Sequence, residues 1–316
     1  MKAIEKITSK NQFTNLYGFT RSLLALGTLI TLAFNHPRLL FFYGLNFETR
    51  YINESSLTFF SLFPDEYLIL AKVIAIIALL IVIIGIYPRY FGIVHWYITF
   101  SFLKDCPVVD GGDQIASILT LLLIPLTLLD ARKNHWNDPS KKNDSPYKQI
   151  IAHFMFFLIQ LQVSFIYFDA AVSKLSVKEW MNGTAVYYWF TSPTFGVHPW
   201  LEPLVFPLLR NPISLTMITW GAIFLELLLA AALFMNYGRR KYLLFAGIAF
   251  HFLIILVHGL PSFFCSMTAC LILYLLPSDH RFNMEKIKSL RITLSKAIKK
   301  NILSLPKRVS SGKLVR

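Results

Sequence analysis

The residues that could do chemistry stand where a long apolar run ends, in the stretch YFDAAVSKLSVKEW at 167–180. Lys174 follows small residues that leave room for a ligand, and Asp169 lies five positions before it. Removal from water favours the neutral form of a lysine amine, which can then act as a base. The stretch therefore predicts a catalytic site with Lys174 as the base and Asp169 close enough to exchange a proton with it. The other interpretation is that Lys174 only extends from the last helical turn into lipid headgroups.

The composition predicts that lipid surrounds the elements that position these residues. The chain has 316 residues, 55% of them hydrophobic, and a mean hydropathy of +0.54, which is more apolar than a water-soluble domain. A bilayer core about 30 Å thick takes about 20 apolar residues per helix. We therefore expect an all-α fold, a polytopic integral membrane helical bundle of about eight transmembrane helices. The predicted spans are 17–35, 67–87, 90–103, 114–129, 150–168, 213–235, 242–258 and 261–277.

The distribution of positive charge predicts the orientation in the cell membrane. The net charge is +14, and most lysines and arginines fall at the two ends of the chain and in alternate connecting segments. Basic residues concentrate on the cytoplasmic side of membrane proteins, so both termini are expected to be cytoplasmic. This distribution accounts for the charge without a nucleic-acid partner, and none is expected.

Two regions follow from this pattern. Residues 1–277 form a multi-pass membrane domain, and residues 278–316 form a basic cytoplasmic tail. The tail alternates isoleucine and leucine with lysine and arginine, which predicts an amphipathic helix on the anionic inner leaflet. No cleavage site of small residues follows the first span, so we expect that span to be retained rather than removed as a signal peptide.

The predicted topology gathers further polar residues on the face that holds Lys174. The loop KDCPVVDGGDQ opens the span at 114–129 from that face, and it carries Asp110, Asp113 and Gln114. These three residues are expected to bind substrate, and the two aspartates could hold the protonated lysine. The alternative is that Asp110 and Asp113 only begin a helix, where a carboxylate is favoured by the helix dipole.

An aromatic segment follows Lys174 on the same face. The run EWMNGTAVYYWFTSPTFGVHPW at 179–200 is rich in tryptophan, tyrosine, phenylalanine and proline. Trp180, Tyr187 and Tyr188 are expected to line the substrate site as part of a lid. The other interpretation is an aromatic belt at the membrane surface.

Glu226 and His251 are polar residues inside two predicted spans. A carboxylate within the bilayer is costly unless it is paired or protonated, and His251 at a comparable depth is its expected partner. Hydrogen bonding between helices is the default role of such residues, and proton transfer is the alternative. No metal site is expected, because the spacing of cysteines and histidines fits no zinc motif. A disulfide between Cys106 and Cys265 is conceivable.

Four segments resemble one family of membrane proteins. YFDAAVSKLSVKEWMNGTAVYY resembles the signature of the HTTM superfamily, which contains the vitamin K-dependent γ-glutamyl carboxylases. DGGDQIASILTLLLIP and AFHFLIILVHGLPSFFCSM are similar to other segments of its membrane domain. With NLYGFTRSLLALGTLITLAFN near the N-terminus, the chain is most similar to the SdpB (sporulation-delaying protein B) branch. The resemblance covers residues 15–277.

The resemblance implies two different activities. The carboxylases use a lysine as base towards reduced vitamin K on the lumenal face, and the motif match puts Lys174 at that position. They also carry a large outer-face domain that binds glutamate, for which this sequence shows no counterpart after the last span. Members of the SdpB branch act with a small companion, SdpA, in producing a secreted antimicrobial peptide from a toxin precursor.

Three functions remain open from the sequence. The leading hypothesis is an integral membrane factor for maturation or export of a secreted antimicrobial or toxin peptide. It would act at the outer face with an SdpA-like companion and the toxin precursor peptide as partners. The first alternative is a carboxylase-like enzyme with a lysine base, whose cofactor would be a quinone such as vitamin K. The second alternative is a proton-coupled transporter that uses Glu226.

Overall fold

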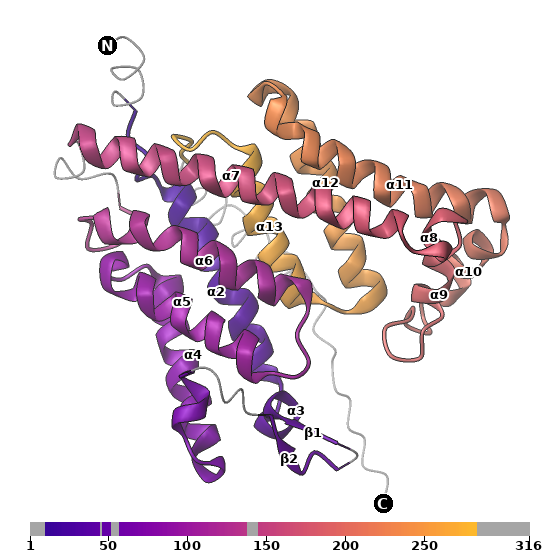
Figure 1. Ribbon diagram of the computed structural model, residues 1–316, viewed down its shortest axis with the longest axis horizontal. Helices are drawn as coiled ribbons and strands as arrows, with labels where there is room; N and C mark the ends of the chain where they lie inside the picture. The colour runs from indigo at the N-terminus through magenta and orange to yellow at the C-terminus, as the bar shows by residue number, and fades with distance from the viewer. Residues whose placement is uncertain (1–9, 45, 52–56, 138–144, 283–316) are drawn as a thin grey trace, which may run out of the picture. The chain divides into compact units, whose positions relative to one another are not determined.

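The computed structural model describes residues 10–44, 46–51, 57–137 and 145–282 (Figure 1). Apart from one short hairpin, the regular structure of these residues is helical, which confirms the expected all-α bundle. The bundle belongs to a unit that ends at His280, and a second unit comprises Arg281–Arg316. The amphipathic helix predicted for the tail falls on 283–316, outside the described residues.

Eight longer helices coincide one by one with the predicted spans. Six of them are long and apolar enough to cross a membrane, as judged by length and composition. Of the other two, Pro261–Leu275 is a shorter apolar helix, and Pro88–Asp105 has 18 residues. The eight are α2 (Asn15–Phe34), α4 (Leu68–Ile84), α5 (Pro88–Asp105), α6 (Gly111–Leu129), α7 (Pro146–Leu175), α11 (Pro212–Ala231), α12 (Tyr237–His258) and α13 (Pro261–Leu275).

Short elements join these helices in two groups. One group lies between α2 and α4 and contains a two-stranded antiparallel hairpin in which Phe42 pairs with Arg50. Its members are α3 (Pro37–Phe41), β1 (Phe42–Tyr43), β2 (Thr49–Arg50), η1 (Phe60–Leu62) and η2 (Asp65–Tyr67). The other elements flank α11: α8 (Lys178–Met181), α9 (Ala185–Phe190) and α10 (Glu202–Arg210) precede it, and η4 (Ala232–Phe234) follows it.

Glycine and proline set several helix ends. Gly85 has a φ of 89° and ends α4, and Pro88 begins α5 three residues later. Gly259, with a φ of 68°, ends α12 just before Pro261 begins α13. Glycine tolerates the left-handed conformation that closes a helix, and proline suits the first helical turn. The chain therefore reverses direction within a few residues between neighbouring helices.

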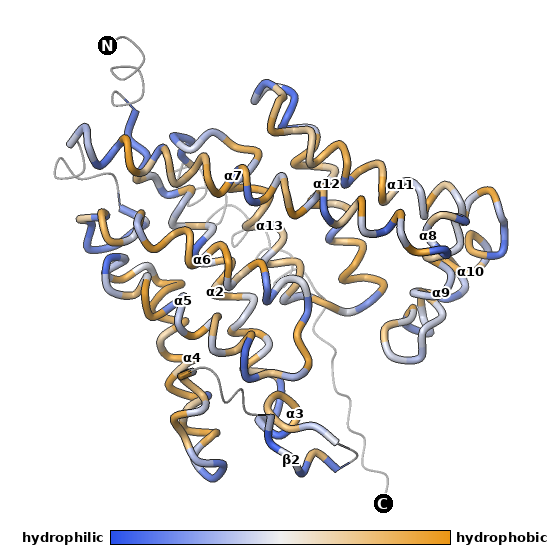
Figure 2. Tube along the Cα trace, viewed as in Figure 1, coloured by the Kyte–Doolittle hydropathy of each residue, from blue (hydrophilic) through white to orange (hydrophobic). Residues whose placement is uncertain are grey.

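Helix α13 lies inside the bundle, whereas α4 lies at its edge (Figure 1) and α12 packs mainly against α13. Every residue from Cys265 to Leu275 is buried, and α13 packs against α2, α6, α7 and α12. Few residues of α4 and α12 are buried, 28% and 11% of their apolar windows, although both helices are strongly apolar. Figure 2 shows these apolar stretches along the helices, with hydrophilic residues concentrated towards several helix ends. Exposed apolar helix faces of this kind are expected to contact lipid.

Candidate functional site

Lys174 and Glu226 form an ion pair between two helices. Lys174 lies on the last turn of α7, and Glu226 lies in the second half of α11. The ammonium Nζ donates to Oε1 of Glu226 at 2.8 Å and to Oε2 at 2.7 Å. The lysine side chain is 22% exposed and the glutamate side chain 10%. The pair is therefore held between packed helices but is still accessible from outside the protein.

The remaining contacts of Lys174 fix its position. Its Nζ donates a third hydrogen bond, at 3.1 Å, to the carbonyl of Ala170 one turn earlier. A lysine ammonium has three donors, so these three bonds use all of them. The Trp180 ring of α8 lies over the ammonium with its centroid 5.3 Å from Nζ, which is a cation–π contact. Lys174 thus joins α7, α11 and α8.

The aromatic segment contributes Trp180 to this pair, whereas Tyr187 and Tyr188 lie at the surface. Their exposed fractions are 43% and 59%, and their rings pack against each other edge to face. Within the described residues neither tyrosine has a recorded contact with Lys174. Their expected substrate role stays a prediction.

The expected pairing of Glu226 with His251 is corrected by the structure. The bonded partner of Glu226 is Lys174, because α7 continues as a helix to Leu175 and packs along α11. His251 instead shares a hydrogen bond of 3.1 Å between its Nε2 and the hydroxyl of Tyr167 on α7. His251 is 3% exposed and forms a buried polar contact between α12 and α7.

The aspartates predicted near Lys174 do not bond to it. Asp169 is exposed on α7 and forms no recorded ion pair with any described residue. Asp110 and Asp113 form a capping box at the start of α6, in which each carboxylate accepts a hydrogen bond from the other's backbone N–H. The two aspartates therefore begin the helix, and their expected role in binding substrate stays a prediction. Gln114 is exposed on the first turn of the same helix.

A second polar cluster was not recognised in the sequence. We name it the His135 cluster, and it consists of Tyr17, Arg21, Asp130, Arg132 and His135. Arg132 donates to Asp130 at 2.8 to 3.1 Å, and the two side chains are 1% and 0% exposed. Arg21 contacts His135 Nδ1 at 3.2 Å, and both guanidinium groups lie within 6 Å of the Tyr17 ring centroid, at 5.8 and 5.7 Å.

The proton on His135 can be placed from its neighbours. Burial, together with the nearby charges of Arg21 and Arg132, lowers the pKa of His135 to about 2. The ring is therefore neutral. Because arginine can only donate, Nδ1 of His135 accepts from Arg21, and Nε2 carries the proton next to the Ser22 hydroxyl at 3.4 Å.

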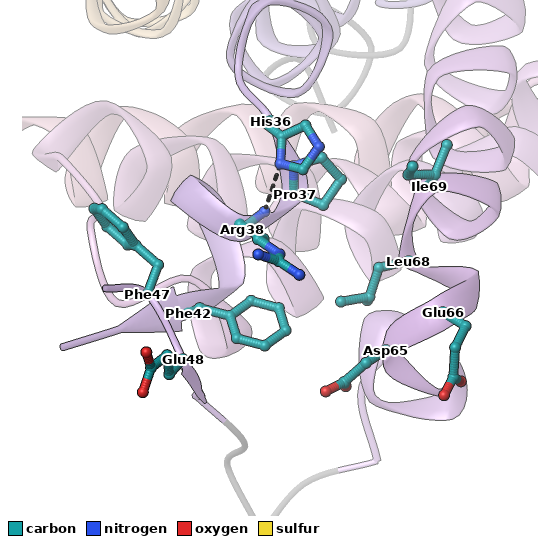
Figure 3. Close-up of a pocket in the computed structure, with 10 residues that line it drawn as sticks. All are labelled: His36, Pro37, Arg38, Phe42, Phe47, Glu48, Asp65, Glu66, Leu68 and Ile69. Atoms are coloured by element: carbon teal, nitrogen blue, oxygen red, sulfur yellow. Dashed lines mark hydrogen bonds between the residues drawn. The ribbon is translucent and has the colours of Figure 1, made fainter. Parts of the chain in front are cut away.

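A cavity of about 710 Å³ lies apart from both clusters (Figure 3). Its walls come from α3, the β1–β2 hairpin, η2 and the first residues of α4. The sequence did not point to it, since its residues are brought together by the hairpin rather than by helix periodicity. The three cysteines, Cys106, Cys265 and Cys270, are buried and free, so the conceivable disulfide is not formed.

Comparison with known proteins places the chain in a family. Residues 43–278 match the HTTM domain. The chain is 39% identical over 285 residues to the sporulation-delaying protein SdpB of Bacillus subtilis (strain 168), covering 88% of this chain and 86% of that protein. The chain belongs to the SdpB family of HTTM-domain proteins.

Other comparisons fit this assignment. The chain is 34% identical over 306 residues to the uncharacterized protein YitO of the same bacterium, covering 96% of this chain and 98% of YitO. No solved structure matches significantly. Lys174 and Glu226 both lie within the HTTM match, whereas Arg21 precedes it. As a member of the SdpB family with several apolar helices, the chain is a multi-pass membrane protein.

The pairing of Lys174 with Glu226 could have been predicted from the sequence. Lys174 and Glu226 are ionisable residues of opposite charge within helices that are apolar enough to span a membrane. Ionisable residues at such positions usually pair with one another, so each predicts the other as a partner. The predicted span at 150–168 ended before Lys174, which concealed this pairing.

Proposed function

We propose that this protein is a membrane factor for the maturation or export of a secreted antimicrobial or toxin peptide. It acts at the outer face of the membrane together with an SdpA-like companion protein. The family assignment supports the peptide system, because the related Bacillus protein is a sporulation-delaying protein. The single observation that carries the site assignment is the ion pair between Lys174 and Glu226.

The ion pair can perform two kinds of work on a peptide. As a charged pair it can accept a hydrogen bond from a peptide N–H or ammonium group at the Glu226 carboxylate, whose oxygens keep acceptor sites free beside the two bonds from Lys174. If the proton passes from Nζ of Lys174 to the Glu226 carboxylate, a neutral amine and a neutral acid result. The amine can then accept a proton from substrate, and the acid can return one, so the proton count balances.

The carboxylase-like alternative is less well supported by this geometry. That reaction would need a quinol in contact with the lysine base. All three donors of Lys174 are engaged by Ala170 and Glu226, and Trp180 lies over the ammonium. The arrangement does not fit a quinone in direct contact with Lys174.

The proposal is tested by replacing Lys174 with arginine. We expect Lys174→Arg to accumulate normally in the membrane but to yield no mature peptide, as Lys174→Ala would, because arginine keeps its proton up to a pH above about 12. The variants would be expressed in a Bacillus subtilis strain that lacks its own SdpB. Membrane protein level and secreted antimicrobial activity would be measured together.

Lys178→Arg is the matched control. Lys178 is an exposed lysine on the neighbouring α8, so its replacement should leave secretion of active peptide unchanged. Full activity of Lys174→Arg would show that the lysine acts only as a positive charge. The proton-transfer role would then be excluded.

A further inference from the structure

The cavity beside the β1–β2 hairpin is lined by charged residues of both signs (Figure 3). Arg38 supplies a positive charge, and the carboxylates come from Glu48 on one side of it and from Asp65 and Glu66 on the other. Its volume of about 710 Å³ lies within the range of roughly 300–1,000 Å³ that is typical of ligand sites. Separated charges of both signs suit a zwitterionic ligand better than an ion of a single charge.

Arg38 is the cation best placed to bind a ligand. Figure 3 shows its guanidinium directed into the cavity beside Phe42. Within the described residues it has no recorded ion pair, whereas Asp65 is already paired with Arg50 at 2.7 Å. The side chain of Glu66 likewise has no recorded partner there. The Arg38 guanidinium and the Glu66 carboxylate are therefore available to a ligand.

The cavity opens where the most apolar helix of the bundle begins. Leu68 and Ile69 line it and are the first residues of α4. Ile69, Val73 and Ile77 follow at four-residue spacing, so they share one face, and they are 58%, 42% and 53% exposed. This apolar face is a surface for hydrocarbon chains, and it leads directly away from the cavity.

Lys72 adds a positive charge at the same level. Its side chain extends from α4 back to the end of α2, where Nζ donates to the Asn35 carbonyl at 3.0 Å. Asn35 directly precedes His36, which lines the cavity. A lysine that reaches from an apolar helix towards its polar end is typical of the boundary between hydrocarbon and headgroups.

We propose that this cavity binds the headgroup of a zwitterionic phospholipid of the phosphatidylethanolamine class. The phosphate lies at Arg38, the ammonium lies near the Glu66 carboxylate, and the acyl chains lie along Ile69 and Val73. Arginine binds phosphate oxygens through two parallel hydrogen bonds, which gives this contact both strength and direction. The inference requires only that the chain lies in a membrane, and it is independent of the proposed peptide function.

The test uses the purified full-length protein in detergent with added phosphatidylethanolamine or phosphatidylglycerol. The thermal unfolding midpoint would be followed by tryptophan fluorescence, because a ligand of the folded state raises that midpoint with its concentration. We expect phosphatidylethanolamine to act at lower concentration than phosphatidylglycerol. Arg38→Gln should weaken the apparent affinity for both lipids about tenfold, since both carry the phosphate.

The carboxylates of the cavity are tested separately by Glu66→Gln combined with Glu48→Gln. This variant should still bind both lipids but should no longer prefer phosphatidylethanolamine, since only the ammonium contact is lost. Arg210→Gln and Glu179→Gln are matched controls on exposed residues of α10 and α8, and they should behave like the unchanged protein. If Arg38→Gln yields little folded protein, Arg38→Lys tests the same contact. It keeps the charge without the paired donors, so it should give an intermediate loss.

Two results would overturn the proposal. One is an equal response of the unchanged protein to both lipids, which would remove the zwitterionic assignment. The other is an unchanged response of the Arg38 variants, which would place any bound lipid elsewhere on the surface. Mass spectrometry of the lipids that copurify with the unchanged protein and with Arg38→Lys gives a second readout, and the Lys variant should retain less phosphatidylethanolamine.

Discussion

The two polar clusters differ in how completely they are closed. The His135 cluster lies where α2 begins and α6 ends, and the Arg132–Asp130 ion pair in it is at most 1% exposed. The Lys174–Glu226 pair lies at the last turn of α7, and its lysine is 22% exposed. Both clusters contain paired charges in an apolar bundle. Only the second one leaves a path by which a substrate could reach a charged atom.

The His135 cluster holds separate segments of the chain together. A Cβ atom at Gly85 would lie 2.4 Å from Cδ2 of His135, and one at Gly18 would lie 2.8 Å from the same atom. The histidine ring is therefore packed directly against the backbones of α2 and of the turn after α4. The guanidinium of Arg132 also holds the carbonyls of His135 and Asn137 at 2.9 Å. Such a cluster fixes three segments together and has no room for a ligand at the histidine.

The difference in exposure predicts which ion pair supports folding and which supports activity. A buried ion pair contributes little net stability when intact, yet it is costly to break because one charge is left without a partner. Mutation of the buried Arg132–Asp130 pair should therefore mainly reduce the amount of folded protein. The accessible pair should respond mainly through activity, because water can reach a charge that loses its partner.

The largest effect is expected for Asp130→Asn. It leaves Arg132 as a buried charge without its carboxylate, which costs about 3–5 kcal/mol and is a large part of the stability of a typical protein. The amount of monodisperse protein extracted from membranes should fall steeply, as measured by size-exclusion chromatography. Asp279→Asn is the control, because Asp279 pairs with Lys10 at the surface, where such a pair contributes at most about 1 kcal/mol. Equal yields for the two variants would contradict the structural role of the closed cluster.

The spans could be predicted because they depend on local sequence. Apolar length and the positions of proline and glycine located each of the eight helices, including the short break of Gly259 and Leu260 between α12 and α13. The end of α7 was placed too early, at 168. An apolar run ends where hydrocarbon ends, whereas the helix itself continues to Leu175 through residues with good helix propensity.

The side-chain contacts could not be predicted in the same way. The Lys174–Glu226 pair joins residues that are 52 positions apart, and the contact of Arg21 with His135 joins residues 114 apart. Helix periodicity states which face a residue occupies but not which helix packs against that face. The capping role of Asp110 could be anticipated, because it depends only on residues within three positions of it.

An intermediate effect is expected when the accessible pair is replaced by apolar residues. Lys174→Met and Glu226→Leu should each lower the free energy of unfolding by an amount on the order of 1–2 kcal/mol, because each leaves one partly buried charge unpaired. This loss is measured as a fall in the thermal unfolding midpoint. The double variant should recover most of that loss, since it leaves no charge. All three variants should fail to produce mature peptide. A double variant that restored both stability and peptide production would show that this pair, like the closed one, is only structural.

The smallest effect is expected for Trp180, which contacts Lys174 through its ring alone. A cation–π contact at an accessible site contributes about 0.5–1 kcal/mol, which corresponds to a change of about two- to fivefold in a rate or affinity. Trp180→Leu should therefore reduce the output of mature peptide by about that factor at unchanged protein level, and Trp180→Phe should reduce it less because an aromatic face remains. Trp189→Leu is the matched control, because Trp189 lies on α9, is 51% exposed and has no recorded contact with Lys174 among the described residues. The same loss from both leucine variants would assign the aromatic segment to the membrane surface, since a general anchoring role does not depend on which tryptophan is removed. A loss confined to Trp180 would identify its ring as part of the accessible site.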